Sequence, residues 1–466
     1  YDYWEMMRRH PRCIGGFLWV LADEGVKRVD MDGFIDNQGN FGADGIVGPH
    51  HEKEGSYYTI KQLWSPVQVM NTAIDRNFNG RLSVENRYDY LNLNTCRFIW
   101  QQVKFPSVTD ASNTTTRILK QGEVQGNDVA AHGVGVVDIK TSILPEADAL
   151  FLTVIDKYGH ELWRWTFPVD KLNRETEQFS ASSGRASYTE TEKGITVKAN
   201  GRTFVFSKED GQLKDVSVNN RKISFANGPR FIGARRADRS LDQFYNHDDE
   251  KAKAKDRTYS EFTDAAVFTK LDVKEEGGNL ILTANYKLGN LDKAQWTIHP
   301  DGMATLDYTY NFSGVVDLMG ICFDYPEEQV LSKRWLGAGP YRVWQNRIHG
   351  TQYDIWENDY NDPIPGETFT YPEFKGYFGS VSWMSIRTKE GTISLTNETP
   401  DSYIGVYQPR DGRDRLLYTL PGSGISVLNV IPPVRNKVNS TDLCGPSSQP
   451  KWVDGPQTGR LVLRFE

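Results

Sequence analysis

The chain has 466 residues and a formal net charge of −7, from 54 basic and 61 acidic side chains. This length predicts about three domains, and mild acidity over so long a chain argues against nucleic acid as a partner. No apolar run approaches the ~18 residues of a membrane helix, so no membrane partner is expected. Aromatic residues make up 12% of the chain, which suits sugar stacking and equally suits a β-sandwich core.

The cysteines are widely separated, with no metal-type spacing, and they neither require nor exclude a disulfide: Cys13, Cys96, Cys322 and Cys444.

The first 25 residues have the pattern of one helix-to-strand step of an α/β barrel. Apolar residues near helical spacing occupy positions 3–7, and Pro11 ends the expected helix. The run FLWVLA, residues 17–22, is too short for a helix and too evenly apolar for a half-exposed strand. We therefore expect a fully buried strand of a parallel sheet. Residues at the carboxyl ends of barrel strands face the active site.

The stretch HPRCIGGFLW, residues 10–19, resembles the segment that enters the eighth barrel strand of glycoside hydrolase family 2, especially the large bacterial β-galactosidases. The resemblance implies that Trp19 is the tryptophan forming the floor of the sugar pocket. Leu21 stands where the family has a second tryptophan, and Asp23-Glu24 replaces the closing Asp-Gln pair.

The barrel pattern ends with a Gly-rich loop, residues 37–50, and a helical stretch, residues 54–63. FGADGIV, residues 41–47, resembles the family pattern F-x-x-N-G-L-V. The resemblance implies that Phe41 and Asp44 help to hold a monovalent cation and the sugar hydroxyls, so that Na⁺ or Mg²⁺ would belong to the parent enzyme. Asp44 replaces an asparagine, so its side chain accepts but does not donate. The alternative for Asp44 is that it caps a turn. His50 is a further candidate substrate contact, and the alternative is an ordinary loop histidine.

The sequence of residues 67–171 predicts an all-β unit, expected to be an immunoglobulin-like sandwich. Alternating stretches predict strands, and the polar segment 107–126 predicts a loop followed by an edge strand. NRYDYLNL, residues 86–93, resembles a segment of the family's second immunoglobulin-like sandwich. We assign no chemistry to this unit.

A polar stretch, residues 172–185, is the expected linker to a terminal domain of short strands, residues 186–466. A hairpin is expected at residues 203–213 and a last strand at 461–465. RWLGAGPYRVWQNR, residues 334–347, resembles W-x-G-x-G-P-x-E-x-Y-x-D-R of the family's terminal supersandwich. Arg342, Trp344 and Asn346 replace the usual Glu, Tyr and Asp.

Aromatic residues gather between Tyr341 and Phe378, next to acidic and amide side chains. Aromatic faces with carboxylates are typical of carbohydrate pockets, so Trp344 is a candidate sugar wall. A core stripe beside a solvated acidic loop is the alternative. The other members are Tyr353, Trp356, Tyr360, Phe369, Tyr371, Phe374 and Tyr377.

No catalytic residue is assigned within this chain. Retaining glycosidases use two carboxyl groups about 5–5.5 Å apart, and in the resembled family both lie on earlier barrel strands, upstream of residue 1. Glu5 lies inside the expected helix. Asp23 and Glu24 are adjacent on a strand and would point to opposite faces. No nucleophile elbow, phosphate loop or Cys/His metal array is present.

The expected fold is mainly β: the truncated end of a (β/α)8 catalytic barrel, residues 1–66, then an immunoglobulin-like β-sandwich and a large antiparallel β-supersandwich.

The resemblance implies the C-terminal part of a retaining exo-acting β-glycosidase, most simply a β-galactosidase. The implied partner is the N-terminal part of the same enzyme, and a homo-oligomer is an option. The sequence leaves the compartment open, with the bacterial periplasm or secretion favoured over the cytoplasm. The departures at Leu21, Asp44 and Trp344 predict a roomier pocket for a galactosyl unit on a glycan. The rival is a non-catalytic carbohydrate-binding or scaffold protein built from the same modules.

Overall fold

The computed structural model describes most of the chain, and every structural statement below concerns the described residues: 1–36, 42, 45–110, 115–169, 184–236, 259–262, 264–359, 376–399, 401–406, 424–433 and 445–466. The protein is mainly β, with two large antiparallel sheets, three smaller ones and two α-helices in this part of the chain. The prediction of a mainly β chain with large antiparallel sheets is therefore confirmed. The candidate linker at residues 172–185 lies largely outside the described residues.

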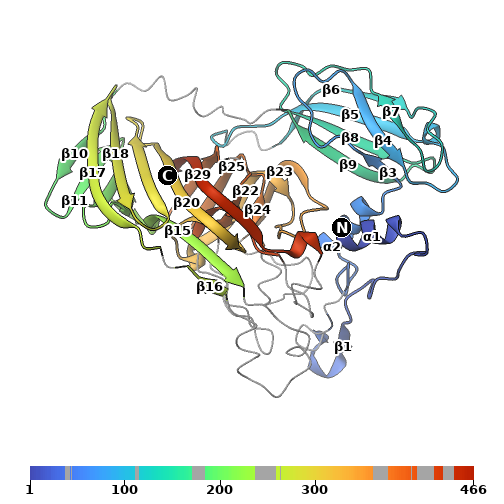
Figure 1. Ribbon diagram of the computed structural model, residues 1–466, viewed down its shortest axis with the longest axis horizontal. Helices are drawn as coiled ribbons and strands as arrows, with labels where there is room; N and C mark the ends of the chain where they lie inside the picture. The colour runs from blue at the N-terminus through green and yellow to red at the C-terminus, as the bar shows by residue number, and fades with distance from the viewer. Residues whose placement is uncertain are drawn as a thin grey trace.

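Both expected N-terminal helices form. Helix α1 spans Asp2–Arg9 and α2 spans Gly55–Leu63. Acidic side chains in the first turn of α1 and arginines in its last turn complement the helix dipole. Between the helices, β1 (Val26–Arg28) and β2 (Phe34–Asp36) pair around a 3-10 turn, Val29–Met31. Figure 1 shows this hairpin projecting away from the sheets.

The predicted buried strand at residues 17–22 is wrong. The segment has no strand conformation, and its side chains are exposed, with Phe17 at 105% and Trp19 at 78%. Only Ala22 makes a bridge, parallel to Val47. A buried parallel strand needs neighbours on both edges and helices over its faces. No described strand lies beside residues 17–20, so the apolar pattern has nothing to pack against.

Residues 67–169 form a two-sheet sandwich, seen at one end of the molecule in Figure 1. One sheet contains β3 (Val67–Val69), β4 (Arg81–Asn86) and β7 (Val134–Asp138). The other contains, in spatial order, β6 (Arg117–Gln125), β5 (Arg97–Lys104), β8 (Ala149–Ile155) and β9 (Glu161–Pro168). Strand β6 lies at the edge, as predicted. The immunoglobulin-like identity of this sandwich stays a prediction.

The NRYDYLNL stretch has a structural role that its position explains. Asn86 is fully buried, and its Nδ2 donates to the carbonyls of Leu91 at 2.8 Å and Val129 at 2.9 Å. Its Oδ1 accepts from the backbone N–H of Tyr88 at 3.0 Å. One amide therefore satisfies three backbone groups at the turn between the sheets.

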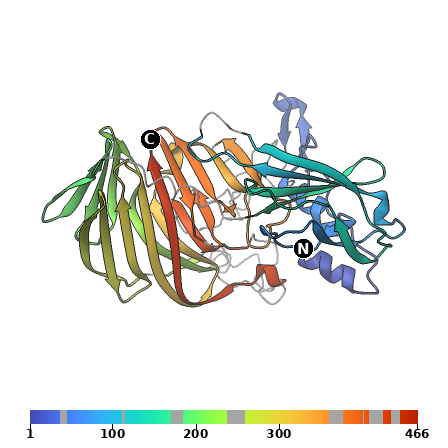
Figure 2. The same cartoon turned by 90° about the horizontal axis from the view of Figure 1, so that it is seen from above.

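The rest of the chain forms a large sandwich of two antiparallel sheets, which Figure 2 shows from above. The first sheet consists of β10 (Ser187–Glu190), β11 (Gly194–Ala199), β12 (Arg202–Ser207), β13 (Leu213–Val218), β14 (Arg221–Ile223), β15 (Ala226–Arg236), β16 (Tyr259–Glu261), β21 (Leu318–Asp324), β24 (Phe378–Gly379), β27 (Tyr403–Val406) and β28 (Ile425–Val430). The second consists of β17 (Val267–Glu276), β18 (Asn279–Lys287), β19 (Leu291–Ile298), β20 (Ala304–Val316), β22 (Val330–Gly339), β23 (Gln352–Asp359), β25 (Trp383–Thr388), β26 (Thr392–Asn397) and β29 (Lys451–Phe465).

One apolar core lies between these sheets and holds side chains from both. Phe206 meets Trp296 edge to face at 5.9 Å between ring centroids. The expected hairpin forms, with β12 paired to β13. The expected last strand also forms, and it is longer than predicted because β29 pairs with β20 along residues 451–463 and with β26 along residues 461–465.

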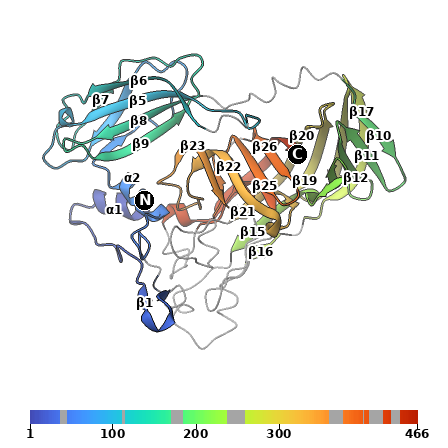
Figure 3. The ribbon, with the colours of Figure 1, turned by 180° about the vertical axis from the view of Figure 1, so that it is seen from behind.

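The small sandwich packs on the second large sheet at β23, as Figure 3 shows. Phe105 meets Tyr353 at 5.7 Å between centroids within a separate apolar cluster that spans both sandwiches. Arg164 Nε donates to Gln352 Oε1 at 2.7 Å, and Thr116 Oγ1 donates to Asp354 Oδ1 at 2.6 Å. Three polar and apolar contacts thus fix β23 against the small sandwich.

Candidate functional site

The structure separates the predicted site residues. Trp19 is exposed, and His50 is exposed in a turn closed by the His51 N–H on the Gly48 carbonyl at 2.9 Å. Trp344, in contrast, is 2% exposed. Phe41 and Asp44 lie outside the described residues, so the cation site that the resemblance implies stays a prediction.

Hydrogen bonds join the stretch after Trp19 to the stretch after residue 44. The N–H groups of Ile46 and Val47 donate to the Leu21 carbonyl at 3.0 and 3.1 Å. In return, the Asp23 N–H donates to the Val47 carbonyl at 3.0 Å, and the Glu24 N–H donates to the Gly42 carbonyl at 2.7 Å. The two stretches that resemble the pocket strand and the pocket loop therefore form one local unit, which we call the pocket junction (residues 21–24, 42 and 45–47).

Asp23 fastens the pocket junction with its side chain. The carboxylate is 6% exposed, and its Oδ1 accepts from the backbone N–H of Gly45 at 2.8 Å. A Cβ on Gly45 would lie 2.4 Å from the Asp23 nitrogen and 2.5 Å from the Val47 oxygen. Glycine is therefore required here by the close approach of two backbones.

Glu54 is the second buried carboxyl group of this region. It precedes α2, is 7% exposed, and its backbone N–H donates to the Ile46 carbonyl at 3.3 Å. Burial, with added repulsion from Asp23, raises the pKa of Glu54 to about 8, although the Arg347 charge opposes the shift. The group is consequently protonated at neutral pH. Glu54 was not predicted from the sequence. Its position just before a helix, where acidic residues are common, was the one available signal.

Arg347 comes from the large sandwich, on a tight turn. Trp344 and Arg347 bridge backbone to backbone, with the Arg347 N–H donating to the Trp344 carbonyl at 2.9 Å. Within the turn, Gln345 Nε2 donates to the carbonyls of Ser447 and Gln449 at 2.8 and 2.6 Å. Burial lowers the pKa of Arg347, and Glu54 counteracts that effect. The 334–347 stretch therefore ends in an arginine whose charge interacts with Glu54 of the N-terminal segment.

The same turn region docks on α2. Tyr341 lies against Tyr58 at 5.4 Å between ring centroids. Thr59 Oγ1 donates to the His349 carbonyl at 2.9 Å, and the Gly350 N–H donates to Gln62 Oε1 at 2.6 Å. Helix α2 is thus held along its length by the large sandwich.

The aromatic residues between 341 and 378 form a core wherever they are described. Trp344 meets Tyr377 edge to face at 5.4 Å inside an apolar cluster, and Tyr353 and Phe378 are buried in others. A buried indole has no free face for a sugar, so the structure argues against Trp344 as a stacking wall. Outside the described residues lie Tyr360, Phe369, Tyr371 and Phe374.

Other features add no site to this region. In the described part of the chain, no group of three or more His, Cys, Asp or Glu side chains is placed to hold a metal ion. Cys13, Cys96 and Cys322 are free thiols, and Cys444 is not described. No described helix is long and apolar enough to cross a membrane.

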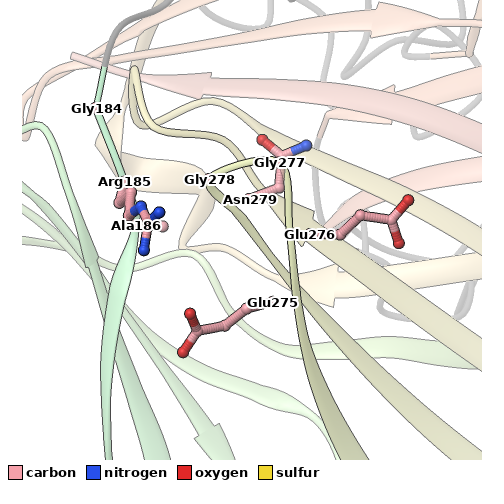
Figure 4. Close-up of a pocket in the computed structure, with 8 residues that line it drawn as sticks. All are labelled: Gly184, Arg185, Ala186, Glu275, Glu276, Gly277, Gly278 and Asn279. Atoms are coloured by element: carbon pink, nitrogen blue, oxygen red, sulfur yellow. The ribbon is translucent and has the colours of Figure 1, made fainter.

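A hollow of about 450 Å³ lies at the tip of the β17–β18 hairpin (Figure 4). It is lined mainly by the backbone of residues 184–186 and 275–279. The side chains of Glu275 and Glu276 point away from one another in Figure 4, so they do not converge on a ligand. This hollow therefore supplies no catalytic geometry.

Comparison with known proteins agrees with the resemblance seen in the sequence. Residues 198–420 match the family described as β-galactosidase small chain. The β-galactosidase of Priestia megaterium is 21% identical over 86% of this chain, and that of Pseudoalteromonas haloplanktis is 21% identical over 78%. The chain spans 39% and 37% of the lengths of these two relatives.

Among solved structures, a galactose 1-epimerase from Lactobacillus acidophilus aligns over 61% of this chain at 11% identity, with a TM-score of 0.31. Membership of glycoside hydrolase family 2 stays a prediction. By sequence, the chain is similar to the C-terminal portion of β-galactosidases.

Proposed function

We propose that this chain is the C-terminal part of a retaining exo-acting β-glycosidase that removes terminal β-galactosyl units from oligosaccharides or glycans. The observation that carries the proposal is the pocket junction. Backbone hydrogen bonds gather the two stretches that resemble the family's pocket strand and pocket loop, and the Trp19 ring, 78% exposed, stands beside them. An exposed indole next to a pinned loop suits stacking on the C–H face of a sugar.

The catalytic carboxyl groups are proposed to lie in another part of the enzyme. Asp23 lies in the pocket junction, Glu54 donates its backbone N–H to Ile46 of the junction, and both are more than nine-tenths buried. Asp23 is engaged by the Gly45 N–H, so it is not free to attack a sugar. A retaining enzyme needs its two carboxyl groups about 5–5.5 Å apart across a substrate. The 466-residue chain alone is therefore expected to be inactive.

The partner that we propose is the N-terminal part of the same enzyme. The exposed side chains of the 14–21 segment are apolar and contiguous along the chain: Ile14, Phe17, Leu18, Trp19 and Leu21. Contiguous exposed apolar groups mark an interaction surface. A barrel strand on each side would cover these groups and satisfy the backbone of the segment.

The test is reconstitution. The chain is assayed for release of nitrophenol from an aryl β-galactoside, alone and joined to the N-terminal part of the enzyme. We expect hydrolysis only in the second case, with the β-anomer formed first, as detected by proton NMR. Activity of the isolated chain that follows its concentration through chromatography would contradict the proposal. So would binding of galactosides by the joined protein without hydrolysis, which would instead identify a carbohydrate-binding protein.

A further inference from the structure

We propose that Asp23, Glu54 and Arg347 form a positioning network that fixes the pocket junction and ties it to the large sandwich. The inference rests on the proposed function in one respect, namely that the junction carries substrate-contacting residues. None of the three residues is assigned to contact substrate. Each acts through the backbone or the side chain of another.

The first link is between Asp23 and the loop. Asp23 uses its Oδ1 to hold the Gly45 N–H and its own N–H to hold the Val47 carbonyl, at 2.8 and 3.0 Å. Both contacts lie directly after residue 44, and Asp23 itself lies four positions after Trp19. The side chain therefore sets the distance between the loop and the segment that carries Trp19.

The second link is between Asp23 and Glu54. Both carboxyl groups are buried, and Glu54 Oε1 has no hydrogen-bond partner among the described residues. Two ionised carboxylates in contact away from water repel one another strongly, so the pair is stable when only one is charged. The groups whose charges act on Glu54 are Asp23 and Glu52, which disfavour its ionisation, and Arg347, which favours it.

The third link is Arg347. Its turn is anchored by buried Trp344 and by the side chain of Gln345 on the 447–449 segment, so its position follows that of the large sandwich. Its charge faces the pair through Glu54. A residue distant in the sequence thus supplies a positive charge that acts on Glu54.

The network makes the junction sensitive to pH in a defined direction. While the pocket junction is closed, with its hydrogen bonds intact, Glu54 has a pKa of about 8. Released from the junction it would return toward its ordinary value of about 4.3. Between these values the closed form binds a proton that the open form has lost, so opening becomes easier as pH rises. Above the higher value the dependence ends, because both forms are then ionised.

Hydrogen exchange on the 466-residue chain tests this without any assay of activity. After correction for intrinsic exchange, protection of the amides of residues 45–47 should fall by up to about tenfold per pH unit between pH 6 and 8. Glu54→Gln resembles the protonated side chain and should abolish that fall. Glu52→Gln, the same change two positions away, is the matched control and should retain it. Equal pH dependence in wild type and Glu54→Gln would overturn the network, as would equal loss of the dependence in both variants.

Kinetics of the complete enzyme test the positioning role. Asp23→Ala removes the Gly45 contact and should raise KM, with a loss of kcat/KM of about tenfold to a hundredfold, because small displacements of a binding loop are costly. Asp23→Asn keeps an acceptor oxygen and should recover part of that loss. Unchanged KM in Asp23→Ala would refute the role. If the complete enzyme hydrolyses no galactoside, the proposed function fails, and the exchange experiment still decides whether the network exists.

Discussion

Asp23 and Gly45 are joined by a hydrogen bond of 2.8 Å from the backbone N–H of Gly45 to the Asp23 carboxylate. This contact closes a loop of which residues 37–41 and 43–44 lie outside the described part. Within this loop, Gly42 is also held, because its carbonyl accepts from the backbone N–H of Glu24. Whatever the loop binds, its anchors are set by a carboxylate and a glycine.

Replacement of Gly45 by alanine should destabilise the protein. The added methyl group would lie within 2.4 Å of the Asp23 nitrogen, where backbone must move. Overpacking of this kind costs about 1–3 kcal/mol, measurable as a lower urea midpoint. Gly16→Ala is the control, because its nearest neighbour is the terminal methyl of Met7, which can rotate away. An equal loss in both variants would show that the tight approach at Gly45 is not the cause.

Glu54→Gln should raise the melting temperature at pH 8 and change it little at pH 5. The native pKa of Glu54, about 8, lies above its value in the unfolded chain, so native protein binds an extra proton between the two values. Stability therefore falls as pH rises through that interval, by up to ~1.4 kcal/mol per unit. Glutamine has no proton to lose and escapes this penalty. Thermal unfolding of both proteins across pH 5–9 measures the gap, and a gap that is constant with pH would contradict the assignment.

Two tryptophans should respond to substitution in opposite ways. Trp344 is 2% exposed and packed on Tyr377, so Trp344→Ala should cost about 3–5 kcal/mol of stability. Trp19 is 78% exposed, and Trp19→Ala should leave stability within about 0.5 kcal/mol. In the complete enzyme, Trp19→Ala should instead weaken kcat/KM for a galactoside, because a stacking ring is lost. A lowered melting temperature with unchanged kinetics would make Trp19 a core residue.

The complete enzyme should prefer galactosyl units on larger glycans to lactose. Trp344 no longer supports this preference, because its ring is buried and cannot stack on a further sugar. The remaining reasons are Leu21, which leaves more room than tryptophan, and Asp44, which accepts hydrogen bonds but does not donate them. The measurement compares kcat/KM for lactose with that for plant or algal galactan oligosaccharides. A clear preference for lactose would show that the substitutions leave the pocket unchanged.

The sequence by itself determined the parts of the fold that depend on local pattern. Period-two alternation located the strands of both sandwiches, because one face of each strand is buried and the other is exposed. Local pattern also located α1 and α2, although no residue of α1 is buried and only Leu63 of α2 is. Short motifs carried the resemblance to β-galactosidases, which the comparisons confirm.

Only the tertiary structure decided what depends on neighbours distant in the sequence. The apolar run at residues 17–22 reads as a buried strand, yet it stays exposed because no described strand pairs with residues 17–20. Trp19 and Trp344 are the same residue type, and packing alone makes Trp19 exposed and Trp344 buried. The proton on Glu54 depends on Asp23 and Arg347, which folding brings to it. Burial and charge act through space, so a one-dimensional pattern does not contain them.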